Sequence, residues 1–275
     1  MQTFKKVAVA AAKEAGGVLR QRLHQQHAIH YKGEINIVTA EDRLSEEMLV
    51  ARIREQFPGH DVLTEESEGI KQGSEYRWII DPLDGTTNYS HGYPVFCVSI
   101  ALEIAGDVVL GVIFNPMLEE LFVAEKSKGA FLNDRRIKVS GTDSLSRSLL
   151  ATGFPYDIRT NPDNNIPYFI GMALKAQAIR RAGSAALDLA YVAAGRFDGF
   201  WELRLNPWDT AAGTLLVRES GGVVSEIGGN PHQLYSPGVV ASNGKVHDEM
   251  LRILQSIDPF GAPAVAAVFR SKTEK

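Results

Sequence analysis

Four apolar segments between residues 95 and 133 constrain the possible folds of this chain most strongly. They read VFCVSIALEI, DVVLGVIFN, ELFVAEK and GAFLN, and each is rich in β-branched or aromatic residues. The short stretches AGD, PMLE and SKG separate them. Because short connections of this kind join neighbouring antiparallel strands, the pattern predicts an antiparallel meander.

Two helices are predicted before the meander. Apolar residues recur at helical spacing from Phe4 to Leu23, which indicates one long amphipathic helix. A second helix should follow Thr39 and stop at Pro58-Gly59. Its inward-facing residues are predicted to be Leu44, Met48, Leu49, Ile53 and Phe57. The N-terminal part is therefore expected to pack helices on an antiparallel sheet.

The pattern changes after residue 145, where short strand-like segments alternate with helical ones. The segments are LLATGF, FDGFWEL, GVVSEIG and VVASN. Helices are predicted from Ser184 to Gly195, from just after Asp209 to Gly221-Gly222, and over 245–257. We therefore expect an α+β half over 1–145, an α/β half over 146–258 and a loosely ordered tail over 259–275.

Composition narrows the classes of function. The 275 residues are 44% hydrophobic, enough for a sizeable core, and the net charge of −4 comes without a basic stripe, which argues against direct nucleic-acid binding. Cys97 is the only cysteine, so an internal disulfide is excluded. No apolar run suits a signal peptide or a membrane span. We expect a cytoplasmic protein that binds a small molecule.

The stretch DPLDGTT, residues 81–87, carries more polar groups than a turn requires. Pro82 lacks a backbone donor and should end the strand, leaving Asp81 at the strand end and Asp84 in the turn. With the Leu83 carbonyl they offer three hard oxygens, which suit Mg²⁺ or Mn²⁺. The alternative is a simple Asx-turn, which the second aspartate and the two threonines disfavour.

Further carboxylates lie elsewhere in the chain. Glu65 and Glu66 are placed at the end of a short strand, and they are either a metal site or an ordinary surface acidic pair. Asp209 is predicted just ahead of a helix, where it either caps free N–H groups or serves as a ligand that the helix dipole keeps ionised.

A hydroxyl and an acid could supply a base for phosphate chemistry. Asp42, three residues after Thr39, has a capping-box position, and Thr86 is a plausible turn hydroxyl. Beside a metal pair, such an acid and hydroxyl can also orient and deprotonate a water. Successive amides from Gly85 onward would cradle an anion if a helix starts there. These features together fit hydrolysis of a phosphate monoester.

Three blocks of this sequence carry a family resemblance. Glu-Glu-Ser at 65–67, DPLDGTTN at 81–88 and PWDTAAGTLLVRESGG at 207–222 closely resemble the inositol monophosphatase family of magnesium-dependent, lithium-sensitive phosphatases. LATGFPYDIRTN and RRAGSAALDLAYVAAGRFDGFWE look like its bacterial branch, and the likeness spans residues 5–255. The resemblance implies a sugar-phosphatase fold like that of fructose-1,6-bisphosphatase, with alternating layers of helices and sheets, and commonly a homodimer.

The resemblance also implies roles for particular residues. The first Mg²⁺ would be held by Glu65, Asp81 and the Leu83 carbonyl, and the second by Asp81, Asp84 and Asp209. Glu65 would also help to hold a weaker third ion, Mn²⁺ could substitute, and Li⁺ would inhibit. Catalysis would involve Glu65, with Asp42 and Thr86 activating the water. The amides of Gly85 and Thr86 would bind phosphate. The sugar or inositol hydroxyls would lie near Asp84, Ala185, Glu202 and Asp209.

Other polar and aromatic residues are interpreted as structural. Lys32 in the loop YKGEINIVTAED is read as a solvated lysine rather than a mobile active-site residue. Arg180 and Arg181 are read as a solvated pair rather than as substrate or partner contacts. The residues assigned to packing or to the pocket rim are His91, Trp201 and Trp208.

The favoured reaction is hydrolysis of inositol monophosphates, and Glu202, a potential acceptor for inositol hydroxyls, favours this substrate. Fructose 1,6-bisphosphate, 3'-phosphoadenosine 5'-phosphate and histidinol phosphate stay open as alternatives, because the metal motifs cannot separate them. A further alternative is a regulatory protein that binds the transcription or ribosome machinery, since some bacterial proteins resembling this one act there.

Overall fold

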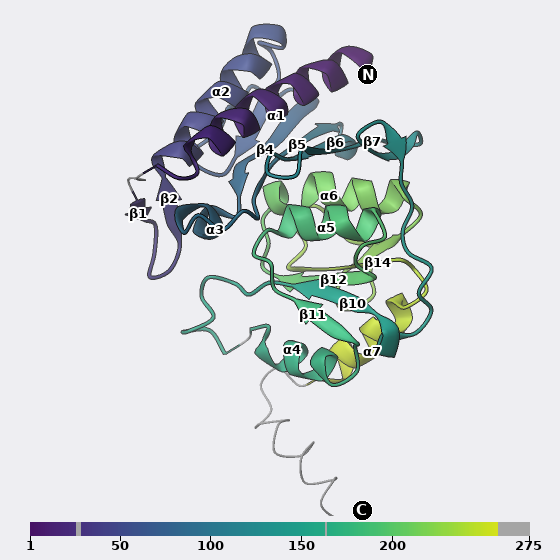
Figure 1. Cartoon of the computed structure of the whole chain (residues 1–275). Helices are drawn as coiled ribbons and strands as arrows, with labels where there is room; N and C mark the ends of the chain where they lie inside the picture. Colours follow the sequence, from purple (N-terminus) through teal and green to yellow (C-terminus); the bar gives the residue numbers. More distant parts are fainter. Residues whose placement is uncertain (26–28, 163, 258–275) are drawn as a thin grey trace, which may run out of the picture.

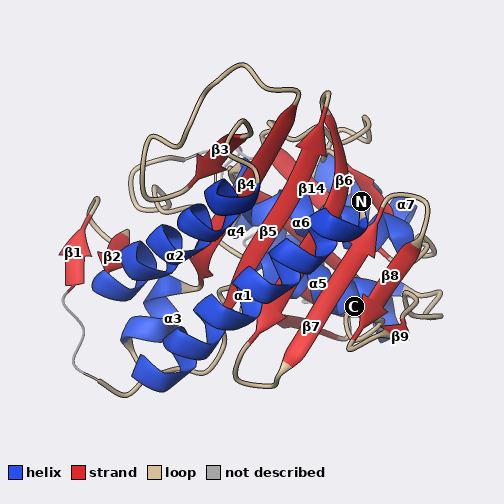
Figure 2. Cartoon of the chain, turned by 90° about the horizontal axis from the view of Figure 1, so that it is seen from above, coloured by secondary structure: helices blue, strands red, loops and turns tan. Residues whose placement is uncertain are grey.

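Two helices at the start of the chain lie side by side across one face of a sheet (Figure 2). The computed structural model describes residues 1–25, 29–162 and 164–257. Helix α1 covers Gln2–Arg22 and α2 covers Ala40–Gln56, close to the predicted limits. Small residues on the buried side of α1 bring it close to the sheet: a Cβ at Gly16 would lie 2.6 Å from the Phe114 ring.

The capping box predicted at the start of α2 is confirmed. Thr39 is the N-cap, and its backbone N–H donates to Asp42 Oδ2 at 2.7 Å. The predicted apolar face of this helix is only partly right. Leu49 and Ile53 are buried, whereas Leu44 and Met48 are half-buried.

The sheet under these helices has seven strands in the order β3-β4-β5-β6-β7-β8-β9. Their bounds are β3 Asp61–Thr64, β4 Tyr76–Asp84, β5 Cys97–Ile104, β6 Asp107–Asn115, β7 Glu120–Glu125, β8 Gly129–Leu132 and β9 Arg135–Arg136. Strands β5 to β8 pair antiparallel in succession, which confirms the predicted meander. Strand β3 pairs parallel with β4 at the edge.

The end of β4 corrects the prediction that the strand stops at Pro82. Strand β4 continues to Asp84, and its register against β5 shifts between Asp81, opposite Ser99, and Asp84, opposite Cys97. A local irregularity accommodates the proline, which cannot donate to the ladder. Helix α3, Thr86–Ser90, begins directly afterwards. Its N-cap Gly85 has φ +103°, and a Cβ there would lie 2.9 Å from the Val95 carbonyl oxygen, so this turn requires glycine.

The second sheet has five strands in the order β11-β10-β12-β14-β13. Their bounds are β10 Leu149–Thr152, β11 Ala178–Arg180, β12 Gly199–Leu203, β13 Val223–Ser225 and β14 Gly238–Ser242. Its helices are α4 Ile166–Ala173, α5 Ala185–Ala193, α6 Pro207–Glu219 and α7 His247–Ser256. Strand β10 pairs parallel with β11 and β12, whereas β14 pairs antiparallel with β12 and β13. The second half is therefore a mixed α/β unit.

Several elements were not predicted from the sequence. They are the antiparallel pair β1 Ile29–Tyr31 and β2 Ile37–Thr39, the strands β9 and β11, helix α4, and a 3₁₀ turn at Leu145–Arg147. All are short, and so they show little periodicity. Helix α6 also begins at Pro207, two residues before Asp209, because Asn206 serves as its N-cap.

The elements stack in alternating layers (Figure 1), as the predicted fold class requires. Helices α1 and α2 cover the seven-stranded sheet, α5 and α6 lie between the two sheets, and α4 and α7 cover the far face of the five-stranded sheet. Leu189 and Leu216 of the middle layer share one hydrophobic cluster with Ile113 of the first sheet and Phe200 of the second. The core therefore runs through both sheets, and the division at residue 145 stays a prediction.

In the described residues, no helix combines the length and apolarity needed to cross a bilayer. The predicted tail over 259–275 lies outside the described residues.

Candidate active site

A cavity opens where the end of β4 meets the helices and strands of the second sheet. Its walls include the predicted residues Glu65, Asp81, Leu83, Asp84, Gly85, Thr86, Ala185, Glu202 and Asp209. They come from β4 and the loops at its ends, α3, α5, β12 and α6. Asp42 is absent from this lining and lies behind Thr86. The fold thus gathers residues spread over 145 positions of the sequence.

Four carboxylates repel one another in this cavity. Burial, and then the charges of Glu65, Asp84 and Asp209, raise the pKa of Asp81 well above its ordinary value. Burial followed by the charges of Asp84 and Glu65 does the same to the pKa of Asp209. Burial also raises the pKa of Glu65 to about 7. Negative charge therefore accumulates here at a cost that a cation would relieve.

Asp84 is held in place by the start of helix α5. Its Oδ2 accepts hydrogen bonds from the Ser184 hydroxyl and the Ala186 amide, both at 2.7 Å. Ser184 is the N-cap of α5, as predicted from the sequence. The Cys97 thiol lies 3.8 Å from the same oxygen and is fully buried, as expected. These contacts orient one carboxylate of the first sheet from the second half of the chain.

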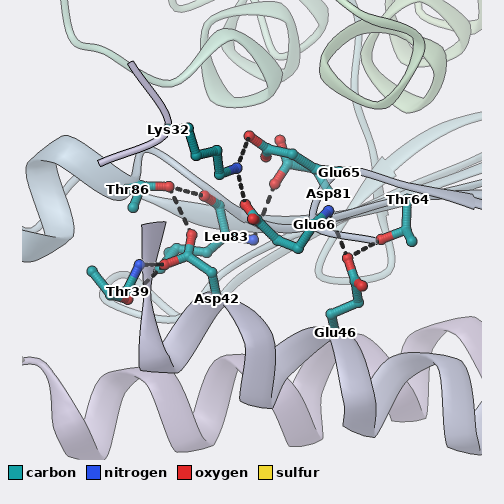
Figure 3. Close-up of polar contacts among 10 residues, drawn as sticks. All are labelled: Lys32, Thr39, Asp42, Glu46, Thr64, Glu65, Glu66, Asp81, Leu83 and Thr86. Atoms are coloured by element: carbon teal, nitrogen blue, oxygen red, sulfur yellow. Dashed lines mark hydrogen bonds and ion pairs between the residues drawn. The ribbon is translucent and has the colours of Figure 1, made fainter. Parts of the chain in front are cut away.

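Asp42 and Thr86 form a hydrogen-bonded pair at the edge of the cavity (Figure 3). The Thr86 hydroxyl donates to Asp42 Oδ1 at 2.8 Å and lies 3.2 Å from the Leu83 carbonyl oxygen. The second oxygen of Asp42 accepts the Thr39 hydroxyl at 2.5 Å. Burial raises the pKa of Asp42 despite these hydrogen bonds. A carboxylate with a raised pKa is a stronger base than an ordinary one, which suits it to take a proton through a hydroxyl.

The interpretation of Lys32 as a solvated loop residue is only partly right: the residue is exposed in the loop after β1, but it also pairs with the acids of the site. Its ammonium group contacts Glu65 Oε1 at 3.2 Å and Glu66 Oε1 at 2.5 Å, and its side chain is only 28% exposed (Figure 3). The charges of these partners raise its pKa even though burial opposes the shift. Lys32 follows strand β1, so the short β1-β2 pair brings it to the acids.

The donor set fits a divalent cation. The carboxylates and the Leu83 carbonyl are hard oxygen ligands, as Mg²⁺ and Mn²⁺ prefer. As the side chains stand, no three Asp, Glu, His or Cys residues in the described ranges are arranged to hold a metal. The shared negative charge and the ligand chemistry nevertheless match such an ion.

The wall of the cavity also contains a carboxylate that the sequence analysis does not name. Asp188, four residues after Ser184 on α5, is buried and has an Oδ1 with no hydrogen-bond partner among the described residues. Burial and then the charge of Glu202 raise its pKa well above the ordinary value. Burial likewise raises the pKa of Glu202 to about 8, and the Arg181 charge opposes this shift. The spacing from the predicted helix start was the available signal for Asp188.

A glycine makes room for Glu202. A Cβ at Gly153, just after β10, would overlap the Glu202 carboxyl group. Gly153 lies in the stretch LATGFP, but no local pattern links it to Glu202. The close approach is a product of the strand pairing between β10 and β12.

Some of the remaining sequence interpretations agree with the structure, and others agree only in part. Arg180 and Arg181 are both exposed, as expected, but Arg181 also lines the cavity. His91 is exposed at the end of α3. Trp201 is fully buried in the core, as predicted, and Trp208 is half-buried and lines the cavity.

Comparisons with known proteins agree with this fold and show the class of the protein, a phosphoric monoester hydrolase. The inositol monophosphatase family model matches residues 1–258. The chain belongs to the inositol monophosphatase family, whose members are generally metal-dependent.

Three relatives illustrate the similarity. The inositol-1-monophosphatase of Synechocystis sp. is 45% identical over 92% of this chain and 89% of its own length. The Nus factor SuhB of Pseudomonas aeruginosa is 43% identical over 93% and 97%. The solved structure of an inositol monophosphatase from Anabaena (Nostoc) sp. has a TM-score of 0.86 at 47% identity, covering 94% of this chain and 97% of that one. The layered fold is therefore that of inositol monophosphatases.

Proposed function

We propose that this enzyme hydrolyses inositol monophosphates to inositol and phosphate with Mg²⁺. The observation that carries the proposal is the joint lining of one cavity by Glu65, Asp81, Asp84 and Asp209. Glu65, Asp81 and the Leu83 carbonyl would hold one ion, and Asp81, Asp84 and Asp209 a second, with Glu65 shared by a weaker third. Bound ions would lower the pKa of a water and neutralise charge on the leaving oxygen.

The protein's own proton acceptor would be Asp42, acting through Thr86. Because the Thr86 hydroxyl donates to Asp42, its oxygen can accept a hydrogen bond from a water in the cavity. As that water attacks phosphorus and the P–O bond to the alcohol breaks, its proton passes to Thr86 while the Thr86 proton passes to Asp42, and the leaving alkoxide takes a proton from solvent. The amides of Gly85 and Thr86 would hold the phosphate oxygens at the start of α3.

The alcohol part of the substrate would lie against Ala185 and Glu202, near Asp84 and Asp209. A carboxylate is a good acceptor for the hydroxyl groups of a polyol. Arg181 partly balances the charge of Glu202. This acidic wall favours inositol hydroxyls over a second phosphate group, and so it favours inositol monophosphates over a sugar bisphosphate.

A substrate panel tests the proposal. Phosphate release from inositol 1-phosphate, fructose 1,6-bisphosphate and 3'-phosphoadenosine 5'-phosphate would be measured with Mg²⁺, with EDTA, and with Mg²⁺ plus Li⁺. We expect the fastest release from inositol 1-phosphate, loss with EDTA, and inhibition by Li⁺. Faster release from another compound would change the assigned substrate but not the proposed metal-dependent hydrolysis. No release from any compound would contradict the proposal.

Cation binding should stabilise the protein more at high pH than at low pH. Because the folded protein raises the pKa of Glu65 from 4.5 to about 7, ionising this group costs stability, and the metal-free protein becomes less stable as pH rises through that interval. A divalent cation offsets this repulsion only where the carboxylates are ionised. We expect Mg²⁺ to raise the Tm clearly at pH 8 and little at pH 5. An equal rise at both would contradict the acidic cation site.

A second function, binding to the transcription or ribosome machinery, is supported by the relatives named Nus factor SuhB. A protein-binding surface need not involve the cavity. Pull-downs from cell extract with wild type and Asp84→Asn would test it, and partners retained by an inactive variant would support separate roles. The homodimer and the cytoplasmic location stay predictions, and sedimentation would test the first.

A further inference from the structure

The buried side of helix α2 is polar where it meets the segments next to the cavity. Asp42, Ser45 and Glu46 are at most 6% exposed, although the sequence pattern had placed apolar residues on this side. Asp42 bonds Thr86, and the Ser45 hydroxyl donates to the Pro82 carbonyl at 2.7 Å. Each of these contacts reaches the segment that contains Asp81, Leu83 and Asp84. Glu46 instead reaches a different segment.

Glu46 binds both neighbours of Glu65. Its Oε2 accepts the Thr64 hydroxyl at 2.5 Å and the backbone N–H of Glu66 at 2.9 Å (Figure 3). Thr64 is the last residue of β3, and Glu65 follows it in the loop. Because one carboxylate oxygen ties the residues before and after Glu65, it restricts the backbone on both sides of that residue.

A carboxylate at position 46 is costly if its role is only to pack. Glu46 is 6% exposed, and burying a charged group costs free energy unless hydrogen bonds compensate it. An apolar side chain here would leave the Thr64 hydroxyl and the Glu66 N–H without this acceptor. Lys32 also pulls Glu65 and Glu66 toward β1, so the loop is held from opposite sides. The two hydrogen bonds of Glu46 compensate for its burial, and they also fix the backbone on both sides of Glu65.

We propose that Glu46 is a positioning residue that sets Glu65 for its contact with a divalent cation. It acts through Thr64 and the Glu66 amide and does not touch the cation or the substrate. The inference rests on the proposed function, because it requires that Glu65 binds a metal. Partners that orient metal ligands contribute 10- to 100-fold to metal affinity in other proteins.

The test measures cation binding directly. Mn²⁺ would be titrated into the metal-free full chain, free Mn²⁺ would be followed by electron paramagnetic resonance, and Mg²⁺ would be added as a competitor. We expect Glu46→Ala to weaken binding by about 10-fold or more. Glu46→Gln keeps an oxygen that can accept both hydrogen bonds, so it should bind within about threefold of wild type. Glu47→Ala, an exposed change on the same helix, is the matched control and should not differ from wild type.

Each result bears on a specific claim. Wild-type affinity in Glu46→Ala, or an equal loss in Glu47→Ala, would overturn the positioning role. If Glu46→Ala does not fold, Thr64→Val removes one of the two hydrogen bonds with little change in shape, and wild-type affinity in that variant would overturn the role. Failure of the wild type itself to bind Mn²⁺ would instead contradict the proposed function.

Discussion

Replacing Asp209 with asparagine should lower phosphate release by at least about 10³-fold while the protein stays folded. Asp209 lies in the first turn of α6 and faces the cavity that Asp84 and Glu65 share. Asparagine removes the negative charge that a shared cation needs, and contributions of several kcal/mol from metal catalysis correspond to about three powers of ten in rate. Asp84→Asn should have the same effect, because it removes another carboxylate from the same cavity.

The same substitution should not destabilise the metal-free protein. Asp209 Oδ2 accepts the Asn206 amide in the capping box, and an asparagine side-chain oxygen can accept that bond as well. Removing one of four repelling charges should keep or raise the Tm without metal. Asp248→Asn provides the control, since Asp248 also lies in a first helical turn but is exposed. Wild-type release by Asp209→Asn would refute the metal assignment.

Thr86→Val should lower kcat by about 10²- to 10⁴-fold, the usual range for losing a general base. Thr86 lines the cavity and Asp42 does not, so a proton leaving an attacking water can reach Asp42 only through this hydroxyl. Valine has nearly the same shape and leaves Asp42 its two bonds to Thr39. Affinity for Mn²⁺ should change little, because the Thr86 side chain is not a proposed ligand.

Asp42→Asn provides the companion variant, and its kcat should fall to a similar level. Because the two residues act in one path, the double variant should be little slower than either single one. Thr87→Val is the control, because the Thr87 side chain lines the same cavity but is exposed and has no part in this path. Additive losses in the double variant would show that Thr86 and Asp42 act separately.

The parts of the fold that were predicted correctly are those with strong local patterns. The meander over β5 to β8 repeats apolar segments between short turns, and the capping box of Thr39 and Asp42 is complete within four residues. Ser184 was recognised as a helix start because a serine precedes a helical run of apolar residues. Short elements such as β1, β2 and β11 escaped prediction because three residues carry no measurable period.

The errors in the site came from contacts between distant segments. Lys32 was assigned to solvent, yet the pairing of β1 with β2 carries it to Glu65 and Glu66. The end of β4 was placed at Pro82, but pairing with β5 resumes at Asp84 and extends the strand beyond the proline. Neither contact can be predicted from the residues that lie next to it in the sequence.

The sequence by itself determined the candidate ligands and the family. The motif DPLDGTT places its aspartates at a strand end, the block around Asp209 places that residue at a helix start, and both blocks resemble the family. Only the tertiary structure decided that Asp42 stands behind Thr86, that Glu46 holds the neighbours of Glu65, and that Asp188 lies buried beside the cavity. Burial and hydrogen bonding between distant segments depend on how layers pack, and local periodicity does not encode that packing.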